Sequence, residues 1–161
     1  MGVFKSEKRV RLPKGGDVLS AFVESAKNKR ILGSAGVTDV LTAARKGFLQ
    51  KRDAHYDGEL ADLLGAKFGV KFDQFLAFRK VEEHADDWHK VEDSKGKRSA
   101  AGFLQVVVHG GCRVKAGGVE VELRRGDVFV LNPNRLHEVL SRSLCVTVVA
   151  DIAWKERTLY L

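Results

Sequence analysis

The spacing of apolar residues changes near residue 70, and this change limits the folds that the chain can adopt. Before residue 70, apolar residues recur at helical spacing, whereas after it they alternate or form short continuous runs separated by Gly, Asn and Pro. About seven short strands in roughly 85 residues favour an antiparallel sandwich or barrel. We therefore expect an α+β chain in which a helical segment, residues 1–70, packs on a β-barrel domain, residues 71–161.

The first part of the chain predicts three helices, over residues 17–30, 36–52 and 59–69. The first places Val18, Leu19, Phe22, Val23 and Ala26 on one face. In the third, ELADLLGAKFG, the leucines and Phe68 are expected to point inward. We expect these helices to cover the outside of the barrel.

The second part of the chain contains apolar segments typical of strands. They are FDQFLAFRKV, GFLQVVVHGG, CRVKA, VEVELR, DVFVLN, HEVLS and LCVTVVADIAW. A polar stretch over residues 84–102, HADDWHKVEDSKGKRSAAG, interrupts the first two, and it predicts a long loop. Loops of this length in compact domains are often functional.

The net charge of +7 is confined to the first third of the chain. Residues 1–53 hold 12 Lys and Arg against 5 Asp and Glu, whereas residues 54–161 hold 16 of each class. A basic face of this kind fits nucleic acid or another acidic partner, and it equally fits a solvated helical face. The sequence leaves both interpretations open.

The composition is that of an ordinary globular domain, with 44% apolar and 30% charged residues. No apolar run has the length of a membrane helix, and residues 1–16 lack the apolar segment of a signal peptide. Cys112 and Cys145 lie in predicted strands without the paired spacing of a zinc site, so we expect buried, reduced thiols. These features predict a cytoplasmic protein without a membrane partner.

The segment GGVEVELRRGDVFVLNPNRLHEV, residues 117–139, combines a hairpin, a Gly-Asp turn, a buried strand, a proline corner and a histidine that opens the next strand. In this order the chain resembles the double-stranded β-helix superfamily, the jelly roll shared by Fe(II)/2-oxoglutarate-dependent oxygenases and by cupins. The resemblance extends over residues 72–153. It implies that His137 is a metal ligand at the mouth of the barrel; the alternative is a histidine that merely caps a strand end.

The oxygenase resemblance also implies a His-x-Asp/Glu motif upstream of His137. His84-Ala85-Asp86 matches this motif, so the implied ligands are His84, Asp86 and His137, a set that suits Fe(II). Alternatively, His89 binds the metal with a displaced acid, Glu92 or Asp93. A charged surface loop without a metal accounts for the same residues.

The same resemblance implies a basic residue that binds the far carboxylate of 2-oxoglutarate. Arg142 is the candidate, five residues after His137, and Arg113 and Arg79 on neighbouring strands are substitutes. The implied activity is a hydroxylase-type oxygenase with Fe(II) and 2-oxoglutarate as cofactors. The substrate stays open between a small molecule and an acidic one, and the basic first third slightly favours an acidic or nucleic-acid substrate over a neutral amino acid.

The cupin resemblance implies a different metal motif, which this chain lacks. Residues 97–104, KRSAAGFL, contain no His-x-His, and His109 beside Gly110 is expected to be a turn residue. A cupin-like chain of this kind would bind a small molecule without metal, or would serve as a structural or assembly protein. The helical segment could then be a surface for homo-oligomer formation.

Overall fold

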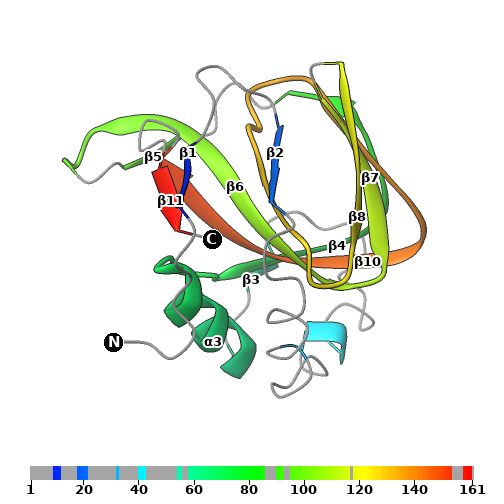
Figure 1. Cartoon of the computed structure of the whole chain (residues 1–161), viewed down its shortest axis with the longest axis horizontal. Coiled ribbons are helices and arrows are strands. Elements are labelled where there is room, and N and C mark those ends of the chain that lie inside the picture. The colour runs from blue at the N-terminus through cyan, green and yellow to red at the C-terminus, as the bar shows by residue number, and fades with distance from the viewer. Residues whose placement is uncertain are drawn as a thin grey trace.

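The computed structural model describes residues 9–11, 18–21, 32, 40–42, 54–55, 58–85, 90–92, 95–116, 118–153 and 158–160 (Figure 1). Its elements are β1 (Arg9–Arg11), β2 (Val18–Ala21), β3 (Ala54–His55), α3 (Glu59–Phe68), β4 (Gln74–His84), β5 (Lys90–Glu92), β6 (Arg98–His109), β7 (Gly111–Ala116), β8 (Val119–Arg124), β9 (Val128–Leu131), β10 (His137–Ala153) and β11 (Thr158–Tyr160). Helical backbone also occurs at residues 32 and 40–42.

The strands form one large antiparallel sheet with the order β2-β9-β6-β10-β4-β3. The β7–β8 hairpin branches from β10, and β5 pairs with β6. β1 and β11 form a separate two-stranded sheet. All strand pairs in the described residues are antiparallel, and the observed half-barrel confirms the predicted antiparallel, jelly-roll-like architecture.

β10 gives the sheet its curvature, because it runs through both walls of the barrel (Figure 1). Its first residues, His137–Leu140, pair with β7, and its last residues, 146–153, pair with β6. Between them the register with β4 is irregular, and the Ser141 hydroxyl contacts the carbonyl oxygens of Gly111 (2.6 Å) and Ser143 (2.7 Å). The sequence predicted two separate strands here, whereas the structure has one strand with an irregular segment that turns it.

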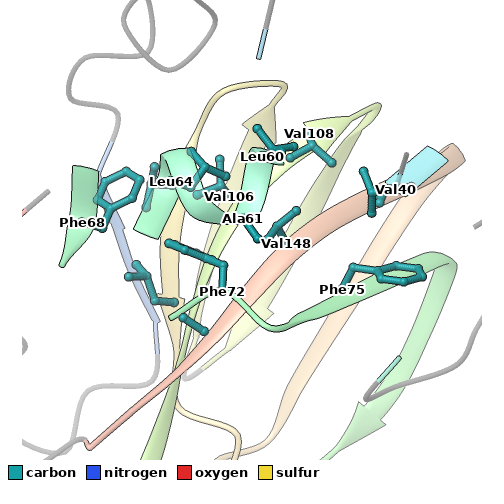
Figure 2. Packing of buried hydrophobic residues seen from close by; sticks show 14 of the residues in the cluster. Val40, Leu60, Ala61, Leu64, Phe68, Phe72, Phe75, Val106, Val108 and Val148 are labelled. Atoms are coloured by element: carbon teal, nitrogen blue, oxygen red, sulfur yellow. The ribbon is translucent and has the colours of Figure 1, made fainter. Parts of the chain in front are cut away.

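α3 covers the outer face of the sheet, as the helical spacing predicted. Leu60, Leu64 and Phe68 are buried, and they pack with Val106, Val108 and Val148 of β6 and β10 (Figure 2). The helix ends at Gly69, which adopts φ +70° and donates its N–H to the Gly65 carbonyl at 2.8 Å. A left-handed conformation at this position favours glycine.

The opposite face of the sheet is enclosed by the β7–β8 hairpin. A second cluster of buried side chains lies on this interior face, and its members come from β4, β6, β7, β8, β9 and β10: Phe78, Val107, Cys112, Val114, Ala116, Leu123, Phe129, Leu131, Val139 and Cys145. Along each central strand, successive side chains point alternately into this interior cluster and into the outer cluster under α3.

Two sequence predictions were wrong in part. Residues 18–21, expected within the first helix, form β2 and pair with β9. Pairing with β2 covers an edge of β9 that would otherwise expose backbone hydrogen-bonding groups. These residues therefore form a strand although their apolar side chains have helical spacing. The polar stretch of residues 84–102 is not one long loop either, because β5 pairs with Arg98–Ala100 around a turn in which Gly96 has φ +76°.

Candidate functional site

The corner between β9 and β10 places His137 at the start of β10. The Asn132 side-chain oxygen accepts a hydrogen bond from the Asn134 backbone N–H at 3.0 Å, and the Asn132 carbonyl accepts one from Arg135 at 3.2 Å. Asparagine forms such local turns readily, because its short side chain mimics the backbone. The segment Asn132-Pro133-Asn134 therefore turns the chain as the sequence predicted.

His137 faces the barrel interior and is 4% exposed. Its register partner on β7 is Ala116, a member of the interior cluster, and it lies two residues from Val139 of the same cluster. The ring nitrogen Nδ1 lies 2.7 Å from the Arg135 carbonyl oxygen. A carbonyl oxygen can only accept, so Nδ1 carries the proton, and in the neutral ring Nε2 carries the lone pair that a ligand to a metal needs.

His84, the last residue of β4, is the register partner of His137 on that strand. Residues directly opposite in an antiparallel pair have Cα atoms about 4.5–5.5 Å apart, a separation that lets two imidazoles share an ion. The side chain of His84 is not among those described, and Asp86 and His89 lie outside the described residues. The metal site formed by His84, Asp86 and His137 therefore stays a prediction.

Within the side chains that the structure describes, no group of three or more His, Cys, Asp or Glu residues could hold a metal ion. At the corner between β9 and β10, the described side chains thus provide the imidazole of His137, which by itself does not make a three-ligand Fe(II) centre. Completion of such a centre would need side chains from residues 84–89.

The arginines proposed to bind a cosubstrate are exposed. Arg142 lies in the irregular segment of β10, and Arg79 lies on β4. Arg113 on β7 forms an ion pair with Glu120, with Nε and Oε1 3.1 Å apart. None of the three is buried in the barrel interior, and the role of Arg142 stays a prediction. His109, expected in a turn, is the last residue of β6 and directly precedes Gly110.

The interior face carries two polar pairs that sequence reasoning missed. Thr147 on β10 donates to Oε1 of Gln105 on β6 at 2.8 Å. Nearby, Gln74 on β4 donates to Oδ2 of Asp151 on β10 at 3.0 Å. Gln105 interrupts the apolar run FLQVVV, and a polar residue in the middle of a buried strand is the signal that could have found it.

Both cysteines are buried free thiols, as expected, and both belong to the interior cluster. A hydrogen bond with Cys112, followed by burial and the charge of Cys112, raises the pKa of the Cys145 thiol far above its ordinary value. Cys145 is therefore a neutral, poorly nucleophilic side chain.

Residues 93–161 match the family model of the AraC-like ligand binding domain. This match covers β6 to β11 and includes His137 and Arg142, but it begins after His84 and Asp86. Together with the antiparallel half-barrel, it identifies the fold as a cupin-like jelly roll. The oxygenase resemblance receives no support from it. A search of curated proteins finds no match to the chain.

The described residues include no helix with the length and apolar character needed to cross a membrane. The basic residues of the first third lie mostly outside the described residues, so a contact with nucleic acid stays a prediction.

Proposed function

We propose that the barrel is a small-molecule-binding domain, and that the ligand binds against its interior face. The observation that carries this proposal is the match of residues 93–161 to a ligand binding domain. The cupin-like alternative from the sequence, binding of a small molecule without metal, agrees with this match better than an oxygenase does.

The chemistry of the interior face supports the proposal. Ligand sites in proteins are mainly apolar, with a few polar groups that orient the ligand. The interior cluster supplies apolar and aromatic side chains such as Phe78 and Phe129, while Gln105, Thr147 and His137 supply buried hydrogen-bonding groups. Buried polar groups reduce stability unless they are paired, and Gln105 and Thr147 meet this need by pairing with each other on the face where a ligand would bind.

A thermal-shift screen of uncharged, anionic and cationic small molecules tests this function. A ligand present at about 100 times its Kd stabilises the folded state by about 2.7 kcal/mol. For a chain of this size, that corresponds to a rise in Tm of about 5–10 °C. We expect at least one class of compounds to give such a shift.

The variant Leu64→Ala is a matched control, because Leu64 is buried on the outer face under α3. This variant should unfold at a lower temperature yet show the same ligand-induced rise in Tm. If no compound of any class raises Tm, the chain is a barrel without a ligand-binding role.

A metal-dependent oxygenase is the second candidate, and it rests on the register pairing of His84 with His137. Fe(II) and 2-oxoglutarate would together supply the electrons that activate dioxygen, the oxidant in such an enzyme. The test is metal analysis by mass spectrometry of protein purified without chelator, with and without 2-oxoglutarate. His137→Ala should abolish metal binding, His84→Ala and Asp86→Ala should strongly reduce it, and His89→Ala should have little effect.

His109→Ala is the control for this experiment, because His109 pairs with Val146 on β10, away from the start of that strand, where His137 pairs with His84. Metal loading should also fall below about pH 6.5, where imidazole becomes protonated. Loss of metal in His89→Ala but not in His84→Ala would show that the ligand assignment is wrong. Unchanged metal content in all variants would exclude this candidate.

A further inference from the structure

The Gln105–Thr147 pair lies at the centre of the wall that faces the barrel interior. Thr147 is opposite Val107 in the β6–β10 register, and Gln105 is opposite Phe129 in the β6–β9 register. Val107 and Phe129 both belong to the interior cluster. Residues that face each other across strands share one side of the sheet, so both members of the pair point into the interior.

The pair leaves one end of the Gln105 amide available. Gln105 is 3% exposed and Thr147 is 0% exposed, so neither reaches bulk solvent. Thr147 donates to Oε1 of Gln105, which directs the donor end of the amide, Nε2, away from Thr147. Within the described part of the chain, this is the hydrogen bond that the Gln105 side chain makes. A primary amide has two N–H donors, so Nε2 can donate to a ligand atom that reaches it.

The surroundings of Gln105 are apolar. Its cross-strand neighbours are Phe129 and Val149, and the residues two positions away on the same strand and face are Phe103 and Val107. A ligand held here therefore needs an apolar body with one acceptor atom, since further polar groups would lose their water without compensation.

The charged side chains near Gln105 disfavour an anionic ligand on the interior face. The Asp151 carboxylate lies on the same face, opposite Phe103. The arginines at positions 79, 113 and 142 are exposed, and the buried Lys67 belongs to α3 on the outer side. A carboxylate ligand at Gln105 would be desolvated without a lysine or arginine beside it among the described residues of this wall, which disfavours its binding.

From these observations we infer that Gln105, oriented by Thr147, is the polar anchor of the ligand site, and that its ligand is an uncharged molecule with an oxygen acceptor on an apolar, ring-sized body. Nε2 of Gln105 donates to that oxygen. This inference rests on the proposed function, and it narrows the ligand class from any small molecule to neutral compounds such as aryl ketones.

Three compounds of nearly equal shape test the assignment: acetophenone, which has the acceptor; α-methylstyrene, in which a methylene group replaces the oxygen; and benzoate, which is charged. Binding is measured by NMR titration of the wild-type protein. A neutral hydrogen bond corresponds to an affinity ratio of about three- to tenfold, so acetophenone should bind more tightly than α-methylstyrene by this factor. Benzoate should bind more weakly than both.

Two variants test whether the preference for acetophenone over α-methylstyrene depends on Gln105. Gln105→Leu should bind acetophenone and α-methylstyrene equally, because the donor is lost while most of the volume remains. The double variant Gln105→Leu/Thr147→Val removes both polar partners at once, which avoids an unpaired hydroxyl and keeps the fold measurable if the single variant unfolds. It should also bind the two compounds equally. Gln74→Leu, which removes the other polar pair, should keep the wild-type preference.

The outcomes separate this inference from the function on which it rests. Equal affinity of the wild type for the two neutral compounds, a preference that survives both Gln105 variants, or tighter binding of benzoate would overturn the assignment. If screened ligands nevertheless bind and raise Tm, the small-molecule function stands and only the role of Gln105 is wrong. If neither these three compounds nor any screened compound binds, both fail.

Discussion

Burial controls the chemistry of Cys145. Its thiol is fully covered by the interior cluster, and its pKa is raised because of the hydrogen bond with Cys112 and the loss of solvent. An unfolded thiol titrates near pH 9.0, whereas the folded one stays protonated well above that pH. The folded state therefore binds the proton more tightly than the unfolded state does.

This difference predicts that stability falls at alkaline pH. Above pH 9.0 the unfolded state loses the proton and the folded state keeps it, so the free energy of unfolding decreases as pH rises. The contribution of Cys145 is about 1.4 kcal/mol per pH unit in that range, and it is fully present below pH 9.0.

Urea unfolding in the presence of reductant, at neutral pH and at about one unit above the thiol's ordinary pKa, measures this contribution. Cys145→Ala should be less stable than wild type at neutral pH because of its lost packing, but its stability should decrease less on the alkaline side, by about 1.4 kcal/mol. Identical pH dependences of the two proteins would contradict the raised pKa of Cys145.

At the level of elements, the turn between β6 and β7 brings two segments of backbone unusually close. Gly110 adopts φ +72°, and a Cβ at this position would lie 2.4 Å from the Leu144 carbonyl oxygen, at the irregular segment of β10. Gly118, in the turn between β7 and β8, adopts φ +77°, but nothing lies within 4 Å of the equivalent Cβ. Each turn thus contains a glycine in the left-handed conformation, but only Gly110 has backbone atoms close to the position of a Cβ.

Alanine at the two positions should therefore have different effects on stability. Gly118→Ala should reduce the free energy of unfolding by about 1–2 kcal/mol, the cost of a left-handed conformation with a side chain. Gly110→Ala should lose about 2 kcal/mol more, because its Cβ also displaces the backbone of β10. Denaturant unfolding of both variants measures the difference, and equal losses would show that the β6–β7 turn can move away from β10.

Apolar periodicity predicted α3 and the central strands, because their side chains alternate between buried and exposed surroundings. It did not predict β2 or β5, since these strands exist through backbone pairing with β9 and β6, and backbone pairing leaves little trace in side-chain pattern. Likewise, the corner at Asn132 was visible in the sequence, whereas the continuity of β10 was not. An irregular segment and a loop have similar polar residues.

The sequence pattern also predicted only part of the candidate site. His137 was predicted from its position after a proline corner, and the structure places it on the interior face. The Gln105–Thr147 pair joins residues 42 positions apart in the sequence, and only the strand register brings them together. The register also aligns His84 with His137, which no local motif specifies.

For the whole molecule, the two faces of one sheet differ in the side chains that they bury. α3 covers the outer face with a contact that is apolar apart from the buried Lys67 (Figure 2). The face enclosed by the β7–β8 hairpin combines apolar residues with buried hydrogen-bonding groups. The outer core contributes to folding, and the few buried polar groups of the interior are consistent with recognition. We therefore propose that the small molecule binds the interior face.

Chemical-shift mapping with the ligand of highest affinity from the screen tests this location of the binding site. In a titration of ¹⁵N-labelled protein, the largest shifts should occur at the backbone amides of residues 103–107 and 145–149, the strand segments whose alternate side chains face the interior. The amides of α3, Glu59–Phe68, should change little, because the sheet separates them from the ligand. Largest shifts on α3, with the interior strands unchanged, would place the ligand outside the barrel and contradict the account.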